Sequence, residues 1–190
     1  MKKFLLISVC FVAFLMLIAL CTSNDSSTES TTESSTNVTQ ESSQVKKSSK
    51  TAWEYCETID EMTDKTTYYA SIESENEVKF EFPYNGGSSL TLTIRDSPQY
   101  GKNMYIKISK GQFNSGFDGT NIKVRFDDKE PITVHCNFPS DYSTDLFFLA
   151  NYNKLLNLIK DSKTMKINAE FFSEGTRTFT FKTEGLEWNH

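Results

Sequence analysis

Apolar and polar residues alternate along most of the chain beyond residue 77. Side chains two positions apart lie on the same face of a β-strand, so this alternation predicts strands with one buried face. The clearest segments are NMYIKIS (103–109), NIKVRFD (121–127), ITVHCNF (132–138), TMKINAEFF (164–172) and TRTFTF (176–181). Turn-forming sequences such as DDKEP (127–131) and SEG (173–175) separate several of them, which is typical of antiparallel strands joined by short turns.

Two further alternating segments predict a hairpin. EVKFEF (77–82) and LTLTIR (90–95) stand on either side of PYNGGSS (83–89). Asn85 and Gly86 tolerate the positive φ angles of a tight turn. We therefore expect these two segments to pair with each other.

One helical pattern interrupts the strands, in NYNKLLNLIKDSK (151–163). The apolar residues that fall on one face of such a helix are Tyr152, Leu155, Leu156 and Ile159. We expect one α-helix at about residues 151–162, with lysines near its end, where the helix dipole favours them. The whole pattern predicts a mainly β fold: an antiparallel β-sandwich or partly open barrel of about seven to nine strands, with the helix covering an edge or an end.

The first twenty residues differ from the rest. Lys2 and Lys3 precede residues 4–20, of which only Ser8 is plainly polar, an order typical of a secretory signal peptide. A helix of that length would span about 26 Å, slightly less than the roughly 30 Å hydrocarbon core of a bilayer. Cleavage after this run is therefore favoured over a membrane span.

Cys21 directly follows the apolar run. The sequence Ile18, Ala19, Leu20, Cys21 resembles the cleavage site of bacterial lipoproteins. The resemblance implies cleavage before Cys21, lipidation of Cys21 with acyl chains such as palmitate, and a lipid anchor in the outer membrane of the bacterial cell envelope. Leu20 departs from the small residue usual before the cysteine, so an uncleaved anchor and ordinary signal cleavage remain alternatives.

Residues 22–50 contain sixteen Ser or Thr residues and no aromatic residue. Such a segment cannot bury enough apolar surface to offset the entropy lost on ordering, so it predicts a disordered tether. The chain then divides into a lipoprotein signal peptide with lipidated Cys21 (1–21), a Ser/Thr-rich tether (22–50) and a β-sandwich-like domain (51–190).

Charge and residue spacing exclude several kinds of chemistry. The formal net charge of −5 argues against nucleic acid as a partner. The only histidines are His135 and His190, and no Cys-x-x-Cys or G-x-S-x-G sequence occurs, so we expect no metal, no cofactor and no enzyme activity. A hydrolase is the least favoured alternative, and it would need a pocket with polar groups around His135, Arg125 or Glu170.

Cysteine usage is consistent with export. Cys10 would leave with the signal peptide and Cys21 would be lipidated, so Cys56 and Cys136 remain as a pair in a compartment that permits disulfides. Alternation puts Cys136 on the inward face of its strand, whereas Cys56 lies on the opposite face from its aromatic neighbours. A disulfide and two free thiols both stay open.

Aromatic residues are the candidate partner contacts. The loop NSGFDGT (114–120) places Phe117 between two glycines, with Phe113 just before it. Such rings either fill the core as a plug or project as binding anchors. Tyrosines are favoured at interfaces, and the candidate contacts are Phe113, Phe117, Tyr100 and Tyr105.

Four longer segments resemble a known group of proteins. They are WEYCETIDEMTDKTTYYASIES (53–74), RFDD (125–128), FFSEGTRTFTF (171–181) and GLEW (185–188). Together they resemble uncharacterised lipoproteins of Bacteroides-type Gram-negative bacteria. The opening segment is also remotely similar to periplasmic domains associated with type VI secretion and with invasion-associated locus B proteins. These resemblances imply a compact β-sandwich-like domain in the cell envelope and no established catalytic residues.

The functional hypothesis is a membrane-anchored envelope lipoprotein that acts as a non-catalytic binding module for a protein or a glycan. The alternative is an accessory or structural component of an envelope secretion or conjugation apparatus.

Overall fold

The computed structural model describes residues 51–114, 116 and 119–190. The predicted signal peptide with Cys21, the predicted tether 22–50 and the candidate contact Phe117 lie outside these residues. The first six strands are β1 (Glu54–Asp60), β2 (Lys65–Glu73), β3 (Val78–Lys79), β4 (Gly87–Ser88), β5 (Leu90–Ser97) and β6 (Gly101–Ile108). The remaining elements are β7 (Thr120–Phe126), β8 (Ile132–Asn137), β9 (Leu146–Leu149), α1 (Tyr152–Lys160), β10 (Met165–Phe171) and β11 (Gly175–Phe181).

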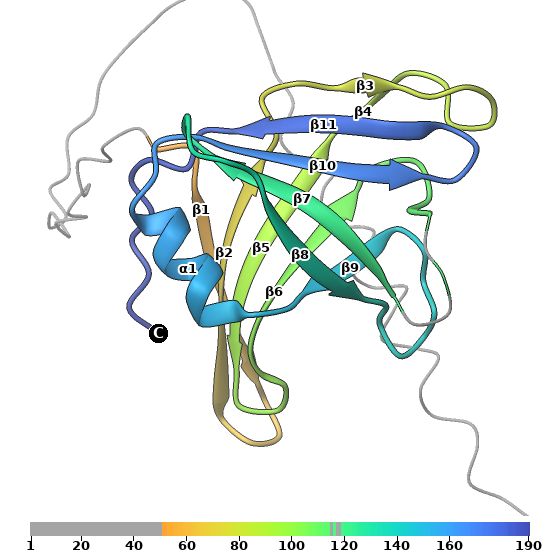
Figure 1. The fold of residues 1–190 in the computed structure, drawn as a ribbon. Helices are drawn as coiled ribbons and strands as arrows, with labels where there is room; N and C mark the ends of the chain where they lie inside the picture. Colours follow the sequence, from red (N-terminus) through yellow and green to blue (C-terminus); the bar gives the residue numbers. More distant parts are fainter. Residues whose placement is uncertain (1–50, 115, 117–118) are drawn as a thin grey trace, which may run out of the picture. The chain divides into compact units, whose positions relative to one another are not determined.

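Nine of these strands form one antiparallel sheet in the order β1-β2-β5-β6-β9-β8-β7-β10-β11. The remaining two, β3 and β4, make a small separate ribbon. The large sheet bends so that β1, β2, β5 and β6 cross the direction of β7, β10 and β11, and α1 lies in the angle between the two groups (Figure 1). The prediction of a mainly β, antiparallel fold with one helix is confirmed.

The core lies between the two groups of strands, because every second residue of each strand points inward. One row of adjacent, buried side chains crosses β2, β5, β6 and β9 and consists of Ile72, Leu92, Ile106 and Phe147. A matching row crosses β7, β10 and β11 and consists of Val124, Ile167 and Phe179. The alternation in the sequence therefore corresponds to one shared apolar interior.

The helix α1 is close to its predicted position. Leu155 and Ile159 are buried in the core, as the spacing of its apolar residues indicates. Lys160 stands in the last turn and donates a hydrogen bond to the carbonyl oxygen of Trp188 at 2.5 Å. The helix thus binds the segment after β11 as well as the core.

The outer edge of β11 is covered by the residues that follow β2. The Glu75 N–H donates to the Thr180 carbonyl oxygen at 2.7 Å. The side-chain amide of Asn76 then donates to the Thr178 carbonyl oxygen at 3.0 Å and accepts from the Thr180 N–H at 2.8 Å. Asn76 therefore replaces the peptide group of a neighbouring strand. The end strands β1 and β11 do not pair with each other, which leaves the barrel partly open.

The hairpin predicted between residues 77–82 and 90–95 is wrong. β3 ends at Lys79 and pairs with Gly87–Ser88, whereas β5 pairs with β2 and β6. Phe80 packs in the core against Phe171, with ring centroids 5.1 Å apart, while Phe82 is 85% exposed. Long-range packing of β5 in the centre of the sheet outweighs the local turn signal, although Gly86 does adopt a positive φ of 95°.

Candidate ligand-binding face

A group of aromatic side chains gathers on the outer face of β6 and β9. Tyr105 of β6 lies opposite Phe148 of β9 in the strand register. Their ring centroids are 5.7 Å apart at an interplanar angle of 66°, an edge-to-face arrangement favoured by the ring quadrupoles. Both side chains are half-buried.

Arg95 of β5 stands at the centre of this group. Its guanidinium carbon lies 4.9 Å from the ring centre of Tyr100, 5.7 Å from that of Tyr105 and 5.9 Å from that of Phe148. These distances allow cation–π attraction to all three rings. We refer to Arg95, Tyr100, Tyr105 and Phe148 as the Arg95 cluster.

The register of β5 and β6 fixes the orientation of Arg95. Asn103 lies directly opposite Arg95, and the Arg95 Nε–H donates to the Asn103 Oδ1 at 3.0 Å. The Asn103 amide nitrogen in turn donates to the carbonyl oxygens of Tyr100 and Gly101, each at 3.3 Å. These bonds direct the amide oxygen of Asn103 toward the guanidinium.

Arg95 differs from the other two arginines of the chain. Arg125 pairs with Asp128 at 3.5 Å, and Arg177 pairs with Glu174 at 3.3 Å. Within residues 51–114, 116 and 119–190, no carboxylate pairs with Arg95. Its charge therefore faces aromatic rings and an amide in place of a carboxylate, and its terminal nitrogens keep their donor capacity.

Tyr105 is held as a neutral phenol. Burial raises the pKa of Tyr105 above its ordinary value of 10.0, against the opposing effects of a hydrogen bond with Thr93 and the charge of Arg95. The Thr93 hydroxyl also lies 3.0 Å from the Ser71 hydroxyl. The Arg95 cluster is thus bordered by a short row of hydroxyl groups on β2, β5 and β6.

The structure brings two of the four candidate contact residues together. Tyr100 is 62% exposed in the turn between β5 and β6, and both Tyr100 and Tyr105 belong to the Arg95 cluster. Phe113 is only 3% exposed, so the prediction that its ring contacts a partner is wrong. Its ring stacks on Phe147 at 4.3 Å and on Phe171 at 4.9 Å, which makes it a plug for the core.

Sequence reasoning missed Arg95 and Phe148. A signal existed for Arg95, because alternation places it on the outward face of its strand, and a hairpin through residues 98–100 sets it opposite Asn103. Phe148 gave no comparable signal, because its position depends on the long-range pairing of β9 with β6.

A second feature is a shallow depression beside β1. Its volume is about 400 Å³, and its lining residues are Tyr55, Cys56, Glu57, Tyr68, Tyr69, Trp188 and His190. Tyr68 stacks on His190 with ring centroids 3.9 Å apart, and the Glu187 N–H donates to the Tyr55 hydroxyl at 2.7 Å. Several of its side chains thus already hold the segment after β11 against β1 and β2.

The two cysteines of the domain are free thiols. Cys56 is exposed on β1, where the register with Tyr69 and Arg95 places it on the outer face. Cys136 is buried on β8 in the core, and burial raises the pKa of its thiol to about 12. The candidate disulfide is therefore not formed, because the two side chains lie on opposite faces of the sheet and on distant strands.

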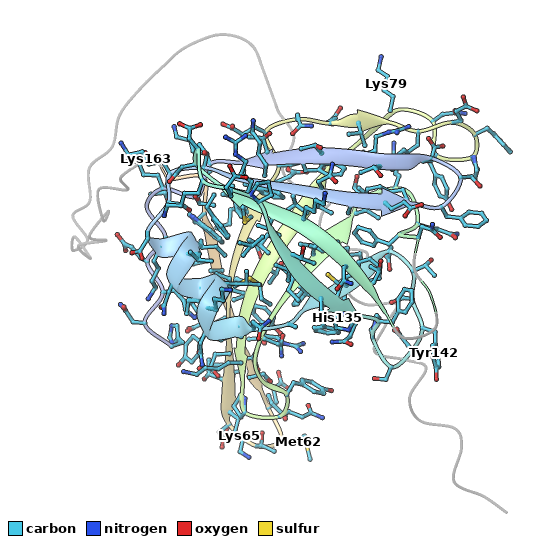
Figure 2. All side chains as sticks on the ribbon, in the orientation of Figure 1. Met62, Lys65, Lys79, His135, Tyr142 and Lys163 are labelled. Atoms are coloured by element: carbon cyan, nitrogen blue, oxygen red, sulfur yellow. The ribbon has the colours of Figure 1, made fainter. Side chains whose placement is uncertain are left out.

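The three residues considered for a hydrolase site are His135, Arg125 and Glu170, and each of them bonds to a different neighbour. His135, labelled in Figure 2, pairs with Asn121 at 3.2 Å, and Arg125 bonds to its own hairpin turn. Glu170 accepts from the Asn114 amide at 2.9 Å. No group of three or more potential metal ligands occurs within the described part of the chain.

Comparison with protein-family models, with curated proteins and with solved structures found no match to this chain. Among the residues that the structure describes, no helix has the length and apolar character needed to cross a bilayer.

Proposed function

We propose that this chain is a membrane-anchored envelope lipoprotein whose domain 51–190 is a non-catalytic binding module, and that the Arg95 cluster is its binding face. The observation that carries this proposal is a guanidinium without a carboxylate partner, surrounded by partly exposed aromatic rings. Arginine and tyrosine are enriched among the residues that dominate binding energy at interfaces. The partner is a protein or a glycan.

A photo-crosslinking experiment tests the binding face. A photoreactive amino acid with an aromatic ring, which keeps a stacking surface at this position, replaces Tyr100 in the full-length chain, in cells that make the protein naturally. The matched control carries it at Tyr142, which is 78% exposed on a different loop. We expect a discrete adduct from position 100 that disappears when Arg95→Ala is added. The absence of an adduct, or the same products from both positions, contradicts the proposal. An adduct with an envelope secretion component favours the accessory role instead.

The lipid anchor is supported by the sequence around Cys21: two lysines, an apolar run and a Ser/Thr-rich segment after the cysteine. Metabolic labelling with an alkyne analogue of palmitate tests it. We expect the wild-type chain and Cys56→Ser to carry the label and to sediment with membranes, and Cys21→Ser to lose both properties. A labelled Cys21→Ser chain contradicts lipidation at this residue.

A further inference from the structure

The terminal nitrogens of Arg95 form an unused binding group. Of the five N–H donors of its guanidinium, only the Nε–H has an acceptor, on Asn103, among the described residues. The side chain is half-buried and surrounded by three rings, so little further rotational freedom is lost when it binds. The planar fork of an arginine matches a carboxylate through two parallel hydrogen bonds.

The surroundings suit one negative charge at a time. Of the two lysines of β6, Lys107 shares the face of Arg95 and lies 3.5 Å from Asp145. Lys102 belongs to the opposite face by the alternation of the strand and lies 3.6 Å from Asp96. The chain as a whole carries a formal net charge of −5. A densely charged polymer such as a nucleic acid would meet repulsion here, because its many phosphates need many unpaired cations.

The peptide groups of Arg95 itself are unavailable to a ligand. β5 lies between β2 and β6, and Arg95 is paired with Tyr69 on one side and with Asn103 on the other. An extended peptide that binds by strand addition needs an open sheet edge. Recognition by Arg95 therefore uses its side chain.

The side chains of the Arg95 cluster offer a flat apolar surface beside the terminal donors of Arg95. The Tyr100 ring is 62% exposed and provides a stacking surface. The guanidinium carbon of Arg95 lies 4.9 Å from the centre of that ring. An acidic sugar presents the matching chemistry, since the C–H groups of its ring form an apolar face and its carboxylate stands at the edge of that face.

We infer that the Arg95 cluster binds the carboxylate of an acidic sugar unit in a glycan, with the sugar ring stacked on Tyr100. This inference rests on the proposed function, because it identifies the ligand class of the same binding face. Arg95 supplies the two hydrogen bonds to the carboxylate, Tyr100 supplies the stacking surface, and Asn103 positions the guanidinium.

Titration of the full-length chain with defined oligosaccharides tests the inference. The probes are oligosaccharides that each carry a single galacturonate, glucuronate or sialate unit among neutral sugars, each beside its neutral, carboxyl-reduced counterpart, and binding is followed by NMR chemical-shift changes. We expect at least one acidic probe to bind about tenfold or more tightly than its neutral counterpart. Failure of all three acidic probes to bind, or equal binding of the neutral forms, overturns the inference.

Variants locate the binding to the cluster. Arg95→Lys keeps the charge but loses the fork, and we expect it to weaken binding about tenfold or more. Arg177→Lys is the matched control, because the Arg177 guanidinium lies 5.9 Å from an aromatic ring but has a carboxylate partner. This control variant should bind the acidic probe as tightly as the wild type does.

Tyr100→Ala is a second test, at an exposed position where the substitution leaves the fold intact. This variant should bind the acidic probe severalfold more weakly. Unchanged binding by Arg95→Lys or by Tyr100→Ala overturns the inference.

The two proposals fail in different ways. An adduct from position 100 that depends on Arg95 but contains a polypeptide keeps the binding face and overturns the sugar as its ligand. The absence of both the adduct and the sugar binding overturns both proposals.

Discussion

Two adjacent phenylalanines of β9 show how differently the two faces of the sheet are used. Phe147 points inward, is fully buried, and its ring lies 4.3 Å from that of Phe113. Phe148 points outward, is half-buried, and contacts Tyr105 and Arg95. The pleat of the strand sends identical side chains to opposite surroundings. The inner ring stabilises the fold, whereas the outer ring belongs to a surface on which a ligand can bind.

The largest expected effect separates these two residues directly. Phe147→Ala should lower the free energy of unfolding by about 3–5 kcal/mol, because it opens a cavity among packed rings. Phe148→Ala should lower it by only about 1 kcal/mol, since its ring is already partly in water. Urea denaturation of both variants measures the difference. Equal losses would contradict the assignment of Phe148 to a recognition surface.

The covered edge of β11 predicts the next largest effect. Asn76→Ala removes two hydrogen bonds and leaves the Thr180 N–H and the Thr178 carbonyl oxygen without these partners, so we expect a loss of about 1–3 kcal/mol. Asn168→Ala is the control, because that amide donates to a hydroxyl on an exposed surface, and it should cost about 0.5 kcal/mol or less. Similar denaturation midpoints for the two variants would refute the role of Asn76.

Asp127 predicts a pH-dependent effect. Hydrogen bonds from the backbone of Thr164, then of Lys163, and from the Thr164 hydroxyl lower the pKa of Asp127 below its ordinary value of 3.8. The folded pKa is depressed, so this stabilisation is present above the unfolded value and is lost as pH falls through the folded value.

Asp127→Asn should therefore melt at a lower temperature than the wild type at pH 7. The difference between the two melting temperatures should shrink as the pH falls below about 4, where the wild-type carboxylate becomes protonated. Asp128→Asn is the control, since the Asp128 side chain is exposed and pairs with Arg125. Thermal melts from pH 7 to pH 2 measure both variants. A constant difference between Asp127→Asn and the wild type over that range would refute the linkage.

The smallest expected effect on the melting temperature is that of replacing the exposed thiol of Cys56. In the native chain we expect a maleimide to label Cys56 rapidly and Cys136 only after unfolding, because Cys136 is buried and burial raises its pKa to about 12. Cys56→Ser should leave the melting temperature unchanged and abolish native labelling within the domain. Peptide mapping by mass spectrometry assigns the labelled residue. Rapid native labelling of Cys136 would contradict its place in the core.

Sequence alternation predicted the strands that have one buried face and one exposed face. β10 at Met165–Phe171 is an example, with its odd-numbered residues buried. It could not reveal β1, because all seven residues of that strand are exposed and no side of it is marked by burial. β9 was missed because LFFL is only four residues long and continuously apolar.

The candidate site was predicted in part for a related reason. Tyr100 and Tyr105 were identified as aromatic residues able to meet a partner, from their chemistry alone. Their association with Phe148 requires the pairing of β6 with β9, and that pairing joins segments far apart in the sequence. Local patterns carry no information on which distant strands become neighbours.

The two end strands of the sheet, β1 and β11, affect whether copies of this protein can pair edge to edge. Asn76 occupies the hydrogen-bonding positions of Thr178 and Thr180 on β11. Among the described residues no strand pairs with the outer edge of β1, which carries Glu54, Glu57 and Asp60 along its length. Carboxylates brought face to face by strand pairing repel one another, and charged edges are a known protection against such pairing. Neither end offers a neutral template, so polymerisation by sheet extension is disfavoured even where many copies are crowded together.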